Sequence, residues 1–270
     1  MTIESDYHIH TPLCKHAEGN PIEYLKEAYK KKLKVIGFSD HSPVPVGFDP
    51  IGRMEMHEFD KYRKLIKEVE ANPYNIEVLF GIEIDWVPDR SNEIYDFIHR
   101  ENFDYVIGSV HHVDGLPIDY SEQMDIWKNN GVDYTWNSYI DSIHSMVSNN
   151  FKFDIIGHLD LPKKFGCFPK DKKYFMDKLA EIFTIVAKKN IFVEISTAGL
   201  RKEVNEIYPS LEILKLAKKH NVKITFSSDS HSPNEVGYCF DVAKKWALKA
   251  GYNEYYVIHK GNRKEKISII

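Results

Sequence analysis

Strand-like and helix-like patterns alternate along the whole chain, and this alternation constrains the fold more than any other feature. Seven short runs of apolar, β-branched or aromatic residues are separated by amphipathic stretches with helical spacing. The runs lie near residues 5–9, 34–39, 77–84, 104–110, 153–158, 191–196 and 222–227. Repeated β-α units of this kind form a parallel sheet covered by helices. The sequence therefore predicts an α/β protein.

The amphipathic stretches indicate where helices begin and which face they bury. Asn20 and Pro21 are typical of a helix start, because Asn caps the first turn and Pro fits its first position. Apolar residues recur every three or four positions over 22–33, 59–69, 136–147, 175–186, 211–217 and 236–247. Gly251 stands where a helix C-terminal cap is expected. No low-complexity linker interrupts the pattern, so one domain over residues 1–270 is the simpler interpretation.

Residues of metal-ligand type follow these runs. Six of the thirteen histidines fall in four short clusters. The clusters are Asp6-x-His8-x-His10, Ser39-Asp40-His41, Ser109-Val110-His111-His112 and Ser228-Asp229-Ser230-His231, and Glu83 and His158 follow two further runs. A closed barrel brings the ends of all its strands to one face, whereas an open sheet brings together only the central ones. The distribution therefore favours a barrel.

Strand geometry supports a metal site at that face. Side chains alternate along a strand, so His8 and His10 share one side, as do Asp229 and His231. A single histidine at a barrel rim is more often a structural residue than a ligand. Burying this many imidazoles and carboxylates without a cation would be costly, so we expect a polynuclear metal site. Zinc, iron and manganese all accept such ligands, which leaves the metal open.

Composition narrows the class of protein. A formal net charge of −4 argues against a general nucleic-acid binder. No apolar run approaches the roughly 18–20 residues of a membrane span, and the N-terminus lacks the basic and apolar regions of a signal peptide. Cys14, Cys167 and Cys239 are widely separated, which fits a reducing compartment. We therefore expect a cytoplasmic location and no membrane partner, while the sequence leaves the oligomeric state open.

In their order along the chain, these motifs resemble those of the PHP-domain phosphoesterases, the polymerase and histidinol phosphatase family. The chain most resembles the monofunctional histidinol-phosphate phosphatase branch, and the resemblance covers nearly all 270 residues. The motifs are Asp6-Tyr-His-Ile-His10, His16, Ser39-Asp40-His41-Ser-Pro43, Gly81-Ile-Glu83, Gly108-Ser-Val-His111, Gly157-His158-Leu-Asp160 and Ser228-Asp229-Ser-His231. The resemblance implies a distorted seven-stranded (β/α)7 barrel of the PHP type and a single phosphoesterase domain over residues 1–270.

The resemblance also implies three divalent metal ions, with zinc, iron or manganese as candidates. One metal would be held by His8, His10, Glu83 and Asp229, a second by Glu83, His111 and His158, and a third by His16, His41 and His231. The implied activity is hydrolysis of the small-molecule phosphate ester L-histidinol phosphate in histidine biosynthesis. A hydroxide shared by two metals would attack phosphorus, because such metals lower the pKa of bound water toward about 7.

Cationic side chains are expected to complete the phosphate pocket, since a guanidinium matches phosphate geometry. Arg201 resembles the family's phosphate-contacting arginine, although family members often carry Asn where Ser196 stands. Lys163 and Lys164 are further candidates, of which only one can point inward. Arg53 is a weaker candidate, with solvation at the surface as its alternative role.

The leaving alkoxide needs a proton, and three sources are considered: Asp40, Asp160 and a water on a metal. Substrate recognition also needs an acidic residue for the ammonium group, with Glu55 and Asp85 as candidates.

Two other functions fit parts of the pattern. The same metals could serve a nucleotide, oligonucleotide or phosphotyrosine substrate, but a nucleic-acid substrate would need an extended basic groove with stacking aromatics. A metal store or sensor would more often close its coordination shells, whereas these shells leave positions for water and substrate.

Overall fold

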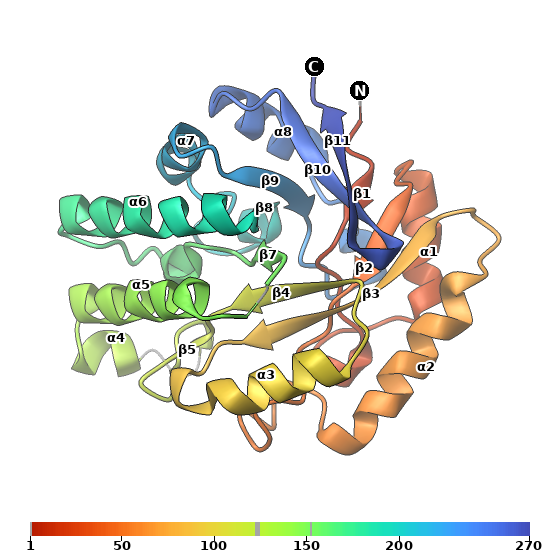
Figure 1. The fold of residues 1–270 in the computed structure, drawn as a ribbon, viewed down its shortest axis with the longest axis horizontal. Helices are drawn as coiled ribbons and strands as arrows, with labels where there is room; N and C mark the ends of the chain where they lie inside the picture. Colours follow the sequence, from red (N-terminus) through yellow and green to blue (C-terminus); the bar gives the residue numbers. More distant parts are fainter. Residues whose placement is uncertain (1, 122–124, 152) are drawn as a thin grey trace.

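The architecture is a barrel of parallel strands enclosed by helices (Figure 1). The computed structural model describes residues 2–121, 125–151 and 153–270. The barrel strands are β1 (Ser5–Asp6), β2 (Val35–Phe38), β3 (Glu77–Asp85), β4 (Tyr105–Ser109), β7 (Ile155–Ile156), β8 (Phe192–Ser196) and β9 (Lys223–Ser227). They neighbour one another in this order, and every neighbouring pair is parallel. Each lies within or overlaps one of the seven expected runs, so the predicted (β/α)7 barrel is confirmed.

The sheet closes just beyond the ends of its first and last strands. Ile9 and Ser230 form a parallel bridge. The His10 N–H donates to Ser230 O at 2.9 Å, and the Ser230 N–H donates to His8 O at 2.9 Å. This seam places ligand clusters from opposite ends of the chain side by side.

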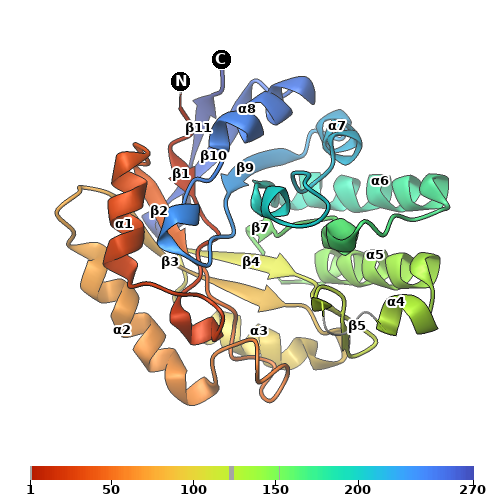
Figure 2. The same cartoon turned by 180° about the vertical axis from the view of Figure 1, so that it is seen from behind.

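Helices cover the outside of the barrel, as Figures 1 and 2 show from opposite sides. They are α1 (Pro21–Lys30), α2 (Phe59–Glu70), α3 (Ser91–Arg100), α4 (Asp125–Asn129), α5 (Val132–Ser148), α6 (Lys172–Lys189), α7 (Leu211–Lys219) and α8 (Phe240–Lys249). Asn20 and Glu23 form a capping box at the start of α1, with Pro21 at its first position, as the sequence predicts. Among the described residues, no helix combines the length and apolar character that crossing a membrane requires.

The last helix differs from the expectation at its start. We expected it to cover 236–247, but α8 begins only at Phe240. A 3-10 turn (Pro233–Glu235) and Gly237, with φ of 57°, precede it and interrupt the helical path. The end of α8 is as expected, because Gly251 follows its cap with φ of 93°, a conformation that glycine adopts without strain.

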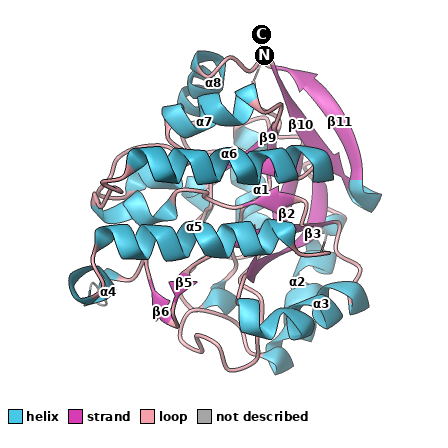
Figure 3. Cartoon of the chain, turned by 60° about the vertical axis from the view of Figure 1, so that its left-hand side comes forward, coloured by secondary structure: helices cyan, strands magenta, loops and turns pink. Residues whose placement is uncertain are grey.

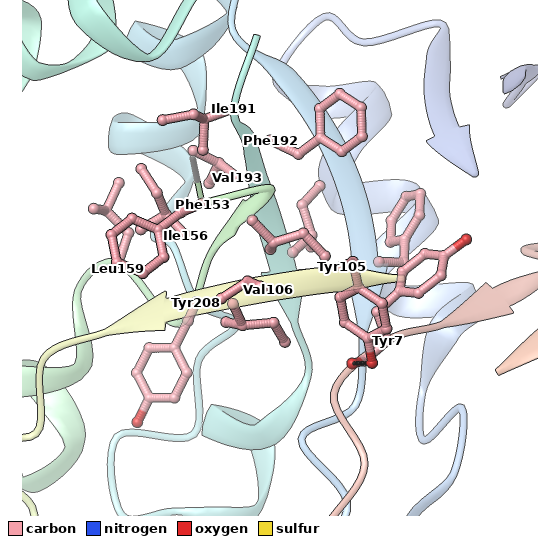
Figure 4. Close-up of a cluster of buried hydrophobic side chains, with 14 of the residues drawn as sticks. Tyr7, Tyr105, Val106, Phe153, Ile156, Leu159, Ile191, Phe192, Val193 and Tyr208 are labelled. Carbon is pink, nitrogen blue, oxygen red and sulfur yellow. Dashed lines mark hydrogen bonds between the residues drawn. The ribbon is translucent and has the colours of Figure 1, made fainter. Parts of the chain in front are cut away.

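Aromatic side chains fill the barrel interior, where Tyr7 and Tyr105 lie close together (Figure 4). The Tyr105 hydroxyl donates to Tyr7 O at 2.6 Å. A β-carbon at Gly81 would lie 2.3 Å from the Tyr105 ring, and one at Gly37 would lie 2.3 Å from its hydroxyl. These two glycines therefore make room for the ring between the strands.

Two hairpins outside the barrel were not predicted, and Figure 3 shows them on opposite sides of it. They are β10–β11 (Glu254–His259 and Arg263–Ser268) and β5–β6 (His112–Val113 and Leu116–Pro117). Tyr7 ties β10 to the barrel, since its hydroxyl donates to Ile258 O at 3.1 Å and accepts the Ile258 N–H at 2.7 Å. The β5–β6 hairpin instead follows β4 closely, at the carboxyl end of that strand, where the predicted ligand His111 lies.

Candidate metal centre and active site

A cavity of about 450 Å³ opens at the carboxyl ends of the barrel strands, a size typical of small-molecule sites. The predicted site residues that line it are His16, His41, Arg53, His111, His158, Lys164, Arg201, Asp229 and His231. The other predicted ligands, His8, His10 and Glu83, are almost completely buried. The barrel ends therefore gather the predicted ligands around one opening.

Four of the predicted ligands, Asp229 among them, lie close together. Nε2 of His8 lies 3.2 Å from Oε2 of Glu83 and 3.7 Å from Oδ1 of Asp229. Nε2 of His10 lies 3.2 Å from the same Asp229 oxygen and 3.7 Å from Oε2 of Glu83. Both imidazoles face the same side of the chain, as their alternating positions predict.

Glu83 presents its other oxygen to a second pair of imidazoles. Oε1 lies 3.2 Å from Nε2 of His158 and 3.6 Å from Nε2 of His111. The two imidazole nitrogens are 3.1 Å apart. Glu83 thus stands between two groups of ligands, where a bridging carboxylate would lie.

The remaining predicted ligands lie on the other side of His10. Nε2 of His16 and Nε2 of His231 are 3.0 Å apart. Nδ1 of His41 lies 2.9 Å from Oε2 of Glu83. His10, His41 and His231 also place ring nitrogens within 4.8 Å of one another. All nine predicted ligands therefore form one continuous cluster.

The hydrogen bonds around the cluster show that a cation fits it. Nδ1 of His16 faces Cys14 O at 2.7 Å, and Nδ1 of His231 faces Asp229 O at 3.3 Å. These acceptors assign the ring proton to Nδ1, so the neutral rings point two Nε2 lone pairs at each other. Such a pair is repulsive unless a proton or a metal ion lies between them.

Unpaired buried atoms give the same indication. Nε2 of His8, Nε2 of His10 and both oxygens of Glu83 approach neighbouring ligand atoms, but they make no hydrogen bond of acceptable geometry with any described residue. Buried polar atoms are rarely left without a partner, because their desolvation is then uncompensated. A divalent cation would satisfy these nitrogen and carboxylate donors together.

The charged side chains of the cluster strongly shift one another's pKa values. Burial alone would raise the pKa values of Glu83 and Asp229, but His8 and the neighbouring imidazoles hold both pKa values well below their usual range. Burial opposes protonation of His8 and His10, yet Glu83, Asp229 and nearby carboxylates raise both pKa values well above the usual one. Without metals, these charges favour protons on His8 and His10, whereas burial lowers the pKa values of His16, His41 and His231.

Two carboxylates hold ligand imidazoles from behind. Oε2 of Glu194 lies 3.0 Å from Nδ1 of His8, and Oε1 accepts the His158 N–H at 2.6 Å. Oδ2 of Asp85 lies 3.1 Å from Nδ1 of His111. Such partners fix the tautomer and orientation of a ligand imidazole. Sequence reasoning missed Glu194, although a carboxylate inside the apolar strand β8 was the available signal.

The two predicted proton donors do not line the cavity. Asp40 is buried; Oδ2 accepts the Thr11 N–H at 3.2 Å, and Oδ1 accepts the His41 N–H at 2.9 Å. Asp160 is also buried, and its Oδ2 accepts the Ser210 N–H at 2.8 Å and pairs with Lys163 at 3.0 Å. Both carboxyl groups therefore serve the surrounding structure, and their positions do not support direct proton transfer to a leaving group.

The paired lysines have different positions. Lys163 is 1% exposed, and its ammonium binds Asp160, Glu206 at 2.8 Å and Ile207 O at 2.8 Å. Lys164 lines the cavity and donates to Asp119 O at 2.5 Å. Of the two, Lys164 is thus the one available to a bound phosphate.

Arg201 is anchored beside the metal ligands. Its Nη2 donates to Ser228 O at 2.9 Å and to Asp229 O at 2.8 Å, and its Nε pairs with Glu235 at 2.9 Å. Its Nη1 is buried and makes no hydrogen bond with any described residue. The guanidinium therefore keeps one nitrogen for an anion.

Arg53 is not a solvated surface residue, so that alternative role is wrong. It is 3% exposed, and its Nη2 pairs with Asp85 at 2.7 Å and with Asp49 at 3.2 Å. Asp85 is thereby engaged by Arg53 and His111, and Glu55 lies on the exposed surface outside the cavity lining. Of the two expected partners for a substrate ammonium, Asp85 is already paired and Glu55 lies away from the cavity.

A β/α barrel whose strand ends carry histidine and carboxylate side chains around one cavity defines a class of metal-dependent hydrolases. The model of the PHP domain family matches residues 6–198 of the chain. The chain belongs to the PHP domain family.

Relatives share most of the chain. A probable histidinol-phosphatase of Deinococcus radiodurans is 33% identical over 246 residues, covering 91% of this chain and 93% of its own. The histidinol-phosphatase of Bacillus subtilis is 27% identical and covers 87% of this chain and 96% of its own. The structure of Lactococcus lactis histidinol phosphate phosphatase, in complex with zinc, L-histidinol and phosphate, has a TM-score of 0.79 at 23% identity. That likeness covers 97% of this chain and 98% of the other and shows the shared fold.

Proposed function

We propose that this chain is a metal-dependent phosphomonoesterase that hydrolyses L-histidinol phosphate to L-histidinol and phosphate in histidine biosynthesis. The observation that carries the proposal is the cluster of nine ligand-type side chains at a cavity that Arg201 and Lys164 also line. Two relatives that cover most of the chain bear the name histidinol-phosphatase or probable histidinol-phosphatase, which supports this substrate. The zinc, L-histidinol and phosphate in the L. lactis protein support the same chemistry.

Three divalent ions, of zinc, iron or manganese, are proposed as cofactors. His8, His10, Glu83 and Asp229 would hold one, Glu83, His111 and His158 a second, and His16, His41 and His231 the third. When bound, divalent cations neutralise phosphate oxygens and activate water for attack on phosphorus. The distances between these side chains and the unpaired Glu83 oxygens support this assignment.

The protein's own cations would orient the ester. Arg201 offers Nη1 to a phosphate oxygen, while its other nitrogens are held by Ser228, Asp229 and Glu235. A guanidinium fixed in this way loses little freedom when it binds phosphate. Lys164 would approach the same group from the opposite loop, and a cavity water would protonate the leaving alkoxide in place of Asp40 or Asp160.

A single domain over residues 1–270 fits this activity, since the cluster draws its ligands from β1 through β9. The cytoplasm remains the expected compartment, because Cys14, Cys167 and Cys239 are all free thiols.

The test is phosphate release by metal-replete protein. L-histidinol phosphate is compared with a nucleoside monophosphate, phosphotyrosine and an aryl phosphate, with His8→Ala as the matched inactive variant. We expect kcat/KM to be highest for L-histidinol phosphate by at least about tenfold, and His8→Ala to abolish it. Equal slow turnover of all four esters would contradict the substrate assignment, and full activity of His8→Ala would contradict the metal site.

A further inference from the structure

The substrate of the proposed reaction carries an ammonium group close to its phosphate. In L-histidinol phosphate, two carbon atoms separate this ammonium from the ester oxygen. A carboxylate that recognises it must therefore lie at the edge of the metal cluster. Glu55 lies outside the cavity and Asp85 is engaged, so the partner has to be another acid of the cavity wall.

Four carboxylates line the cavity, and three of them are committed. Asp229 belongs to the metal cluster. Glu235 pairs with Arg201 and accepts the His231 N–H at 2.8 Å. Asp49 accepts hydrogen bonds from Arg53 at 3.2 Å and from the Tyr120 hydroxyl at 2.8 Å.

Asp119 is the fourth, and its carboxylate is only partly engaged. Oδ2 lies 3.3 Å from the Lys164 ammonium, which donates its shorter bond to the Asp119 carbonyl. Oδ1 is buried and makes no hydrogen bond with any described residue. A carboxylate can accept several hydrogen bonds, and its two oxygens exchange by rotation about a broad, two-fold torsion. The cavity wall thus carries an acceptor whose capacity the described residues do not fill.

The β5–β6 hairpin sets the position of Asp119. The hairpin begins directly after His111 and is followed by Ile118, whose N–H donates to His111 O at 2.9 Å. Lys164, which follows His158 in the chain, then holds Asp119 from the other side. Asp119 therefore lines the same cavity as His111 and His158, one residue beyond the backbone contact that joins Ile118 to His111.

We propose that Asp119 is the specificity residue that binds the ammonium group of the substrate, an inference that rests on the proposed function. Tyr120, the next residue in the chain, also lines the cavity, and its ring is available to contact the imidazole of the substrate. Loss of a charge-assisted hydrogen bond of this kind weakens binding by roughly ten- to a hundredfold.

The test compares an amine with its deamino analogue in wild-type protein and in Asp119→Asn, which keeps the size of the side chain and removes its charge. Calorimetry on metal-replete protein measures binding of L-histidinol and of 3-(imidazol-4-yl)propanol, and kcat/KM is measured for the corresponding phosphates. Asp114→Asn is the matched control, because Asp114 is an exposed aspartate on the same hairpin, outside the cavity lining. Ethyl phosphate and 2-aminoethyl phosphate form a second pair without the imidazole.

We expect Asp119→Asn to lose the preference for the amine in both pairs, while Asp114→Asn keeps it. No preference in the wild-type protein, or an equal loss for both members of a pair, overturns the inference. Good turnover of L-histidinol phosphate with no dependence on Asp119 leaves the proposed function standing and overturns only the inference. An Asp119-dependent preference for amines without turnover of L-histidinol phosphate would overturn the proposed function and leave the inference about Asp119 standing.

Discussion

At the scale of single residues, the proposed metal ligands are held in place by other side chains. Glu194 faces His8 at 3.0 Å and Asp85 faces His111 at 3.1 Å, each at the Nδ1 atom. This arrangement leaves Nε2 of each ring as the donor to a metal. Arg53 extends the second contact outward, because it binds Asp85 at 2.7 Å. The geometry of the cluster therefore depends on the neighbouring carboxylates as well as on the imidazoles.

Asp85→Asn tests that dependence. The variant removes the charge that orients His111, so we expect the metal affinity of the Glu83–His111–His158 group to fall by roughly 10- to 100-fold. Competition with a chelator of known affinity measures the change. Asp89→Asn, an exposed site on the following turn, serves as the control. Unchanged metal affinity in Asp85→Asn would show that the contact has no part in holding the metal.

At the scale of elements, specific contacts close the barrel at its carboxyl end and join a hairpin to it at the other end. At its carboxyl end, the bridge between Ile9 and Ser230 brings the first and last strands together where the ligands lie. At its other end, the β10–β11 hairpin is tied to β1 through Tyr7 and Ile258. The first of these contacts places His8 and His10 beside Asp229 and His231, so it brings together proposed ligands from both ends of the chain.

Tyr7→Phe tests the fastening by the hairpin. The variant leaves the buried Ile258 N–H and carbonyl without the hydroxyl, so we expect the free energy of unfolding to fall by about 1–3 kcal/mol. Denaturant unfolding measures it, and Tyr29→Phe is the control because Tyr29 is exposed. Equal stability of the two variants would mean that the tie contributes nothing.

At the scale of the whole molecule, we expect metal binding and stability to be coupled. Removing metals leaves Glu83, Asp229 and the imidazoles to balance charge with protons, since His8 and His10 have raised pKa values in the metal-free cluster. Metals and protons then compete for the same nitrogens, so metal affinity falls as the pH falls.

Chelation should therefore lower the Tm. A metal present at 100 times its Kd stabilises the folded state by about 2.7 kcal/mol per site. We expect a loss of several degrees in a thermal shift assay, reversed when zinc or manganese is added back and smaller in His8→Ala. A Tm that does not respond to chelation would contradict the coupling.

The sequence predicts the barrel well because its strands follow local rules. Each barrel strand is a short apolar run, and Asn20 with Pro21 marks the start of α1 in the way that capping chemistry requires. The β10–β11 hairpin was missed for a physical reason: β11 reads Arg-Lys-Glu-Lys-Ile-Ser and is mostly exposed, so it lacks an apolar run. Its existence depends on pairing with β10 rather than on its own pattern.

The site residues likewise fall into two groups: those that a local pattern predicts and those that only the folded chain identifies. The predicted ligands follow strand ends, so the barrel brings them together. Roles that depend on contacts between distant segments were not predictable: Glu194 is recognised only by its contact with His8, and Arg53 only by its pairing with Asp85. Asp119 reaches the cavity through a hairpin that the pattern did not indicate.

The proposed three-metal site is tested most directly by a metal titration of the metal-free protein, with bound metal per chain and hydrolysis of L-histidinol phosphate measured on the same samples. We expect no activity without metal, and a rise that reaches its plateau at three ions per chain. Glu83→Gln, which weakens the carboxylate between two of the groups, should bind fewer ions and stay inactive. Full activity of the metal-free protein, or a plateau reached with a single ion, would contradict the proposed three-metal site.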